Sequence, residues 1–128
     1  MTSPTPPKRL LVIDDDAKIT SLFRDFFSDR YAIETAATGA DGLSAMQRQR
    51  PDAVLLDINM PGMSGLDVLK HIKRLDDRIP VIMVTANEDI GTAEQALKDG
   101  AFAYLPKPFH LQYAAHLVAA ALEEKKRR

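Results

Sequence analysis

Apolar residues occur along this chain in short, nearly unbroken runs that alternate with longer segments of helical period. The runs at residues 9–13, 53–56 and 81–84 are typical of strands buried on both faces of a parallel sheet. Residues 31–36 alternate more between apolar and polar side chains and predict an edge strand. Residues 101–105 predict a fifth strand, which we expect Pro106 to stop.

The first three segments between these runs show the spacing of amphipathic helices. In the first segment, one face collects Ile19, Leu22, Phe23, Phe26 and Phe27. A second, weaker helix is predicted at residues 39–49, before Pro51. A third is predicted to begin at Ser64, whose side chain suits an N-cap. The apolar positions predicted for this third helix are Leu66, Leu69, Ile72 and Leu75.

Two more helices complete the pattern, one at residues 89–99 with Gly100 as its C-terminal stop, and one from about residue 111 to the end. Strand and helix therefore alternate five times, which predicts an α/β fold with an open parallel sheet and helices on both faces. We expect a single domain at residues 9–124. A disordered, proline-rich leader is expected at residues 1–8, and a charged helix end or the start of a linker at 125–128.

Composition narrows the classes of function. The chain has 128 residues, of which 45% are hydrophobic and 27% charged, as in a soluble globular domain. Its 17 basic and 18 acidic residues leave a net charge of -1, so we expect no direct binding of nucleic acid. The absence of cysteine excludes disulfides, thiolate catalysis and cysteine-ligated zinc. Without a secretory signal or a spanning run, the chain is expected to be cytoplasmic and to make no membrane contact.

Polar side chains follow four of the predicted strands, at the sheet edge where ligands of open α/β folds bind. These residues are Asp14, Asp15, Asp16, Asp57, Asn59, Thr85 and Lys107. Crowded carboxylates are unfavourable unless a cation or proton joins them, and oxygen ligands without histidine or cysteine favour Mg²⁺. Aspartates after strands also serve as helix N-caps, and each could do only that. The convergence of four strand ends favours a functional site.

Several motifs resemble those of the receiver domain of two-component response regulators, the CheY-like superfamily, over nearly all of residues 9–122. The motifs are Val-Ile-Asp-Asp at 12–15, Leu-Leu-Asp-Ile-Asn-Met-Pro-Gly at 55–62, Val-Thr-Ala at 84–86 and Leu-Pro-Lys-Pro-Phe at 105–109. The resemblance implies a flavodoxin-like (βα)5 three-layer sandwich whose parallel five-stranded sheet has the order 2-1-3-4-5.

The resemblance also implies a role for each residue of the acidic pocket. Asp57 would be the phosphoacceptor. Asp14 and Asp15 would hold Mg²⁺ directly or through water, with Asp57 and the backbone carbonyl of Asn59 as further ligands, and Mn²⁺ could substitute. Lys107 would pair with Asp57 and then with the phosphoryl oxygen. No other cofactor is expected.

Two residues are implied as a switch. Thr85 would move inward to the phosphoryl group, and the ring of Tyr104 would swing into the space behind it. A partly exposed aromatic on an edge strand is the plainer interpretation of Tyr104. The peptide bond before Pro108 would be cis. The altered surface would comprise the fourth helix, the fifth strand and the alanine-rich fifth helix, through which a homodimer is one interpretation. Alanine also simply favours helix.

The phosphoryl donor would be a phosphohistidine on a sensor histidine kinase or a phosphotransfer protein. The domain would not be an enzyme beyond catalysing its own phosphorylation and slow dephosphorylation. Asn59 and Asn87 would flank the pocket where the family tunes phosphoryl lifetime. Three other classes of protein share some of these features. Phosphatases with an aspartyl-phosphate use Asp-x-Asp, which Asn59 breaks; a flavodoxin-like cofactor binder needs a phosphate loop that is missing here. A receiver-like module that binds partners without phosphorylation stays open.

Overall fold

The computed structural model describes residues 5–86 and 90–126. Its five strands are all parallel and lie in the order β2-β1-β3-β4-β5, which confirms the predicted flavodoxin-like α/β fold. The strands are β1 (Arg9–Ile13), β2 (Ala32–Ala36), β3 (Ala53–Asp57), β4 (Val81–Ala86) and β5 (Ala103–Lys107). The helices are α1 (Ala17–Phe27), α2 (Gly39–Arg48), α3 (Gly65–Leu75), α4 (Ile90–Lys98) and α5 (Leu111–Lys126).

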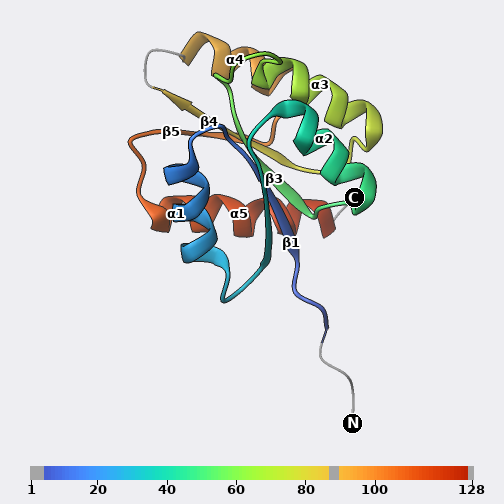
Figure 1. Cartoon of the computed structure of the whole chain (residues 1–128), viewed down its shortest axis with the longest axis vertical. Helices are drawn as coiled ribbons and strands as arrows, with labels where there is room; N and C mark the ends of the chain where they lie inside the picture. The colour runs from blue at the N-terminus through green and yellow to red at the C-terminus, as the bar shows by residue number, and fades with distance from the viewer. Residues whose placement is uncertain (1–4, 87–89, 127–128) are drawn as a thin grey trace.

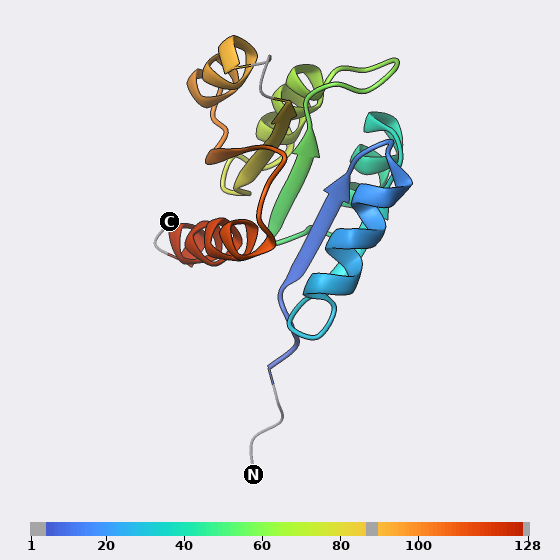
Figure 2. The same cartoon turned by 90° about the vertical axis from the view of Figure 1, so that its left-hand side faces the viewer.

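The sheet lies between two layers of helices. Helices α1 and α5 cover one face, and α2, α3 and α4 cover the other (Figures 1 and 2). Because successive strand residues point to opposite faces, Leu11 and Ile13 belong to the core under α2–α4, whereas Leu10 and Val12 belong to the core under α1 and α5. Burial on both faces explains why β1, β3 and β4 are nearly continuous apolar runs.

The prediction that Pro106 stops the last strand is wrong. β5 begins at Ala103, continues through Pro106 and ends at Lys107. Pro106 lies opposite Thr85 of β4, in the regular register of the pair. β5 is an edge strand, and an edge strand tolerates proline because one side of it needs no ladder donors. The consequence is that Lys107 belongs to the sheet itself and is paired in register with Ala86.

The helices begin and end close to their predicted residues, but their buried faces differ in detail. In α1, Phe23 and Phe27 are fully buried, while Leu22 is 41% exposed. In α3, Ser64 is the N-cap, as predicted, and its hydroxyl accepts a hydrogen bond from the Asp67 N–H. The sequence reasoning missed Val68, which is completely buried under the sheet.

The fourth helix starts at Ile90, and the predicted start at residue 89 lies outside the described residues. Gly100 follows this helix with a φ of 109°, the left-handed conformation that glycine adopts most readily. Among the described residues, no helix combines the length and apolarity needed to cross a bilayer. Residues 1–4 of the predicted leader and residues 127–128 are also outside the described part of the chain.

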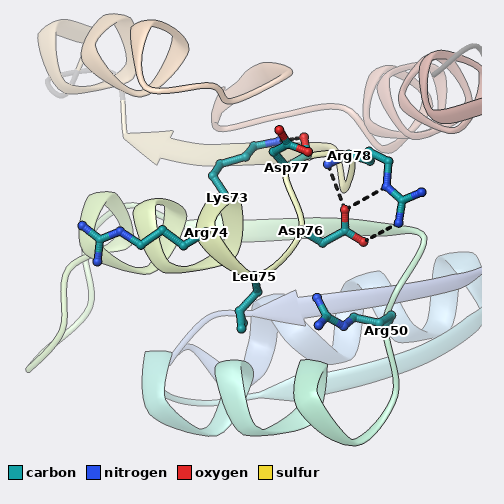
Figure 3. A pocket seen from close by; sticks show the side chains of 7 residues that line it. All are labelled: Arg50, Lys73, Arg74, Leu75, Asp76, Asp77 and Arg78. Carbon is teal, nitrogen blue, oxygen red and sulfur yellow. Dashed lines mark hydrogen bonds and ion pairs between the residues drawn. The ribbon is translucent and has the colours of Figure 1, made fainter.

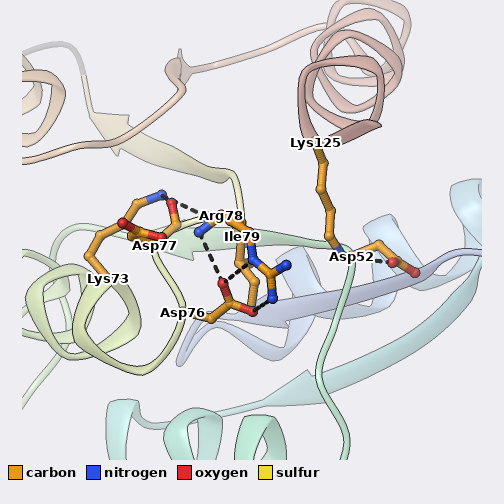
Figure 4. Close-up of polar contacts among 7 residues, drawn as sticks. All are labelled: Asp52, Lys73, Asp76, Asp77, Arg78, Ile79 and Lys125. Atoms are coloured by element: carbon orange, nitrogen blue, oxygen red, sulfur yellow. Dashed lines mark hydrogen bonds and ion pairs between the residues drawn. The ribbon is translucent and has the colours of Figure 1, made fainter. Parts of the chain in front are cut away.

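A polar contact at the base of the sheet ties the end of α5 to the start of two strands. Asp52 precedes β3 and accepts a hydrogen bond from the Arg9 N–H at 2.8 Å. It also accepts one from Lys125 Nζ at 2.9 Å (Figure 4). Burial alone would raise the pKa of Asp52, but these two donors hold it below its usual value. Lys125 is thus part of the folded helix, in the segment where a helix end or linker was expected.

Candidate metal centre at the carboxyl edge of the sheet

Three carboxylates meet where β1 and β3 end. Asp14 directly follows β1, Asp57 is the last residue of β3, and Asp15 is their neighbour in the loop. One oxygen of each lies within 4.8 Å of an oxygen of the other two. Asp14 is 2% exposed and Asp57 5% exposed, whereas Asp15 is open to solvent. The cluster therefore has two buried carboxylates and one that faces water.

Local hydrogen bonds divide the three consecutive aspartates between two tasks. The Asp14 N–H donates to Ala36 O at 3.0 Å, which extends the pairing of β1 with β2 by one residue. Asp14 Oδ1 accepts from the Asp16 N–H at 2.9 Å, and Asp14 Oδ2 is buried without a hydrogen-bond partner. Asp16 is the N-cap of α1 and accepts from the Lys18 N–H. Only Asp14 and Asp15 are left for the pocket.

Among the described residues, the Lys107 ammonium pairs with this acidic group. Lys107 Nζ lies 3.6 Å from Asp57 Oδ1 and 3.9 Å from Asp14 Oδ2. A single ammonium cannot balance three carboxylates. Burial, together with the negative charge of Asp14, raises the pKa of Asp57 to about 6. Burial is also the main reason that the pKa of Asp14 is raised. The pocket thus carries uncompensated negative charge near neutral pH.

The donor set suits a hard divalent cation. All three candidate ligands are carboxylate oxygens, and Mg²⁺ prefers oxygen ligands and tolerates sites that it shares with water. The buried Asp14 Oδ2, which has no hydrogen-bond partner, is an oxygen that such an ion would satisfy. The three histidines, His71, His110 and His116, are exposed and do not belong to the cluster.

The other predicted pocket residues lie around the acidic cluster. Thr85 is buried in β4, and its hydroxyl donates to Ala86 O at 3.1 Å. Asn59 is exposed in the loop after β3, and its N–H donates to Asp57 Oδ1 at 3.3 Å. The Ile58 N–H donates to Val84 O at 3.1 Å and fixes the start of this loop to the neighbouring strand. Asn87 lies outside the described residues.

The last strand and the loop after it contain the remaining predicted residues. Tyr104 is half-buried in β5 and packs against the core under α2–α4. The Lys107–Pro108 peptide bond is cis. Beyond it, the ring of Phe109 stacks on Phe23 of α1, with centroids 5.1 Å apart and planes 4° from parallel. Sequence reasoning missed this stack because the two rings are far apart in the chain.

A second missed residue is Gly65, the first residue of α3. Its N–H donates to Ile58 O at 2.8 Å, so the helix begins against the loop that follows Asp57. A signal was present in the sequence: a glycine directly after the Ser64 cap weakens a helix start and has no benefit for capping. Such a glycine indicates a close approach of two backbones.

A separate polar hollow of about 580 Å³ lies at the opposite end of the sheet, between the loop before β3 and the turn before β4. Here Arg78 Nε pairs with Asp76 Oδ1 at 3.1 Å, and Lys73 Nζ donates to Ile79 O at 2.7 Å (Figures 3 and 4). Arg50 reaches toward the same turn, whereas Arg74 points away from it (Figure 3). These contacts build the turn between α3 and β4.

A doubly wound parallel sheet with an acidic pocket at its carboxyl edge defines a flavodoxin-like α/β protein with a candidate cation site. The family model of the response regulator receiver domain matches residues 10–119, and the chain belongs to this family. It is a signalling module of the phospho-accepting type found in two-component systems.

Individual relatives agree with this assignment. The chain is 43% identical over 112 residues to the DNA-binding transcriptional regulator NtrC of Escherichia coli strain K12, which covers 87% of this chain and 24% of that protein. It is 38% identical over 107 residues to the response regulator MprA of Mycobacterium sp. strain KMS, with 83% and 46% covered. The chain therefore spans less than half the length of these relatives.

Solved structures show the same fold. A response regulator receiver domain protein from Clostridium thermocellum superposes with a TM-score of 0.89 at 33% identity, covering 93% of this chain and 97% of that one. The receiver domain of NtrX from Brucella abortus gives a TM-score of 0.86 at 32% identity, covering 89% and 98%.

Proposed function

We propose that this domain accepts a phosphoryl group on Asp57 from a phosphohistidine, with Mg²⁺ bound by Asp14, Asp15, Asp57 and the backbone carbonyl of Asn59. The observation that carries the proposal is the meeting of three carboxylate oxygens within 4.8 Å beside one lysine ammonium. Mn²⁺, which shares the preference for oxygen ligands, should substitute.

The chain's own residues account for the chemistry of transfer. An oxygen of Asp57 attacks phosphorus as the bond from phosphorus to the histidine nitrogen breaks, and the freed imidazole leaves. Lys107, whose Nζ lies 3.6 Å from Asp57 Oδ1, would balance charge on the transferring oxygens. Mg²⁺ held by Asp14, Asp15 and Asp57 would supply further charge neutralisation. Because the ionised carboxylate is the nucleophile, a cation that lowers the raised pKa of Asp57 also favours the reaction.

The response to phosphorylation is proposed to start at Thr85. Its hydroxyl now donates within β4 and would turn to the new phosphoryl oxygens, which accept hydrogen bonds strongly. Tyr104 is half-buried two residues from Pro106, the strand partner of Thr85, so its ring would enter the space that Thr85 leaves. The signal would then appear on the surface formed by α4, β5 and α5, where a partner or a second copy would dock.

The partner of the domain is proposed to be a sensor histidine kinase or a phosphotransfer protein in the cytoplasm. We propose no direct contact with nucleic acid or membrane, in keeping with the balanced charge of the chain. The only reactions catalysed would be its own phosphorylation and a slow dephosphorylation. The activities of longer relatives such as NtrC are not assigned to this chain.

Incubation with acetyl phosphate and Mg²⁺, followed by intact-mass measurement, tests the proposal. We expect the mass of one phosphoryl group to be added. No mass should be added when EDTA is present before the phosphodonor. Asp57→Asn should abolish the gain. Asp16→Asn is the matched control: this carboxylate lies two residues from Asp14 but caps α1, and asparagine caps equally well.

The outcomes separate the two classes of function that the sequence left open. A gain that survives in Asp57→Asn would refute the assignment of the acceptor. No gain with acetyl phosphate or with a phosphorylated histidine kinase, despite measurable Mg²⁺ binding, would instead indicate a receiver-like module that works without phosphorylation.

A further inference from the structure

We propose that Gly65 is a positioning residue for the acceptor loop: because position 65 has no side chain, α3 can press against the backbone of Asp57 and Ile58 and fix the groups that surround the acceptor. The inference rests on the proposed function, since it concerns the same pocket. It assigns a role in the reaction to a residue that contacts neither the phosphoryl group nor the metal.

The geometry leaves no room for a side chain at this position. A Cβ added to Gly65 would lie 2.3 Å from Asp57 O, 2.6 Å from Ile58 Cα and 3.0 Å from Ile58 O. All three neighbours are backbone atoms, which cannot rotate away as a side chain can. Any L-residue at position 65 must therefore move the start of α3 or the peptide after Asp57 by more than about half an ångström.

The peptide that would move is part of the pocket. The Gly65 N–H donates to Ile58 O at 2.8 Å, and the next amide, that of Asn59, donates to Asp57 Oδ1 at 3.3 Å. The Ile58 N–H bonds to Val84 O on the opposite side. The loop is thus held between α3 and β4, and pushing it from the α3 side shifts the amide and the carbonyl of Asn59 relative to the Asp57 carboxylate.

Backbone conformation does not explain why glycine is needed. The described glycines with positive φ are Gly62 and Gly100, and Gly65 is not among them. The requirement is purely one of space. Gly42 in α2 offers the contrast: an added Cβ there would lie 2.4 Å from Cδ1, 2.8 Å from Cγ1 and 3.3 Å from Cγ2 of Ile13, which are all side-chain atoms and not backbone. Both glycines are buried, so alanine should cost stability at each.

The experiment compares Gly65→Ala with Gly42→Ala. Mg²⁺ affinity is measured by calorimetric titration, and the rate of phosphorylation by acetyl phosphate is measured at saturating Mg²⁺, at a temperature where circular dichroism shows each variant to be folded. We expect Gly65→Ala to lower the rate about tenfold or more and to weaken Mg²⁺ binding severalfold. Gly42→Ala should melt at a lower temperature and keep both values within about twofold of wild type.

Wild-type Mg²⁺ affinity and rate in Gly65→Ala would overturn the proposal, as would equal losses in both variants, which would indicate general overpacking. If the wild-type protein binds Mg²⁺ but is not phosphorylated, the proposed function fails, while the affinity comparison still decides the role of Gly65.

If Gly65→Ala does not fold, a measurement on the wild-type protein tests the proposed role of Gly65. Hydrogen exchange by NMR should show the Gly65 amide protected although it lies in the first turn of a helix, where amides usually lack partners. Added Mg²⁺ should increase that protection severalfold. Exchange at the rate of an unstructured peptide, with or without Mg²⁺, would refute the coupling between α3 and the acceptor loop.

Discussion

The cost of the buried acceptor charge can be measured directly by Asp57→Asn. Burial and the nearby Asp14 raise the pKa of Asp57 from 3.8 to about 6 in the metal-free protein. Below pH 3.8 the carboxyl is protonated in both the folded and the unfolded protein, and the substitution should have little effect. Between pH 3.8 and about 6 the unfolded chain ionises first, so the wild type loses stability as pH rises through this window.

Above the folded pKa the penalty is constant. A shift of roughly two units corresponds to about 3 kcal/mol, so Asp57→Asn should be more stable than wild type by about 2–3 kcal/mol near pH 7.5 without Mg²⁺. At about pH 5 the difference should fall to roughly half. Urea unfolding followed by circular dichroism suits this protein, which has no tryptophan.

Two controls sharpen this test. Asp16→Asn should leave stability within about 0.5 kcal/mol of wild type, because its side chain is exposed and asparagine keeps the cap. Saturating Mg²⁺ should stabilise the wild type and narrow the gap in stability, because the proposed ion site exists only when the carboxylates are brought together by folding. A variant no more stable than wild type in EDTA, or an advantage that does not depend on pH, would refute this account of the pocket.

Two further substitutions test other contacts of the structure. Lys107→Ala removes the ammonium 3.6 Å from Asp57; the pKa of Asp57, followed by carboxyl NMR, should rise further, and phosphorylation should slow by about ten- to a hundredfold. An unchanged pKa would mean that Lys107 has no electrostatic effect on the acceptor. Asp52→Ala breaks the bonds from Arg9 and Lys125 and should cost about 1–2 kcal/mol at neutral pH without slowing phosphorylation. Because the pKa of Asp52 is lowered in the folded protein, the stability that Asp52 contributes should be lost as pH falls through that pKa. A destabilisation by Asp52→Ala that is equal at all pH values would contradict this pH dependence.

The alternation of strands and helices and the convergence of polar residues could be predicted because they follow from strong local signals, whereas the strand order was predicted only from the resemblance to receiver domains. Buried parallel strands must be apolar along their whole length, and the side chains after them must meet at one edge. Asp14, Asp57 and Lys107 were found in this way, although nothing in their spacing gives the distances between them. The same reasoning left the role of Asp16 undecided, since a carboxylate after a strand fits a cap and a ligand equally well.

What was missed depends on contacts across the chain. Pro106 reads locally as a strand end, and only its place at the sheet edge makes it acceptable inside β5. The closeness of Gly65 to the peptide after Asp57 is set by how α3 packs on the sheet. The hydrogen bond from Lys125 to Asp52 joins residues 73 positions apart, and no local sequence pattern predicts it.

The stacked rings of Phe23 and Phe109 have a mechanical consequence. Phe109 comes two residues after Lys107, and its ring lies flat against a fully buried residue of α1. The first helix and the cationic end of the last strand are therefore one packed unit, and a tilt of the helix would be transmitted to the ammonium. We expect a displacement of α1 to shift Lys107 as well, and line shapes of the Phe109 ring in NMR spectra would report it.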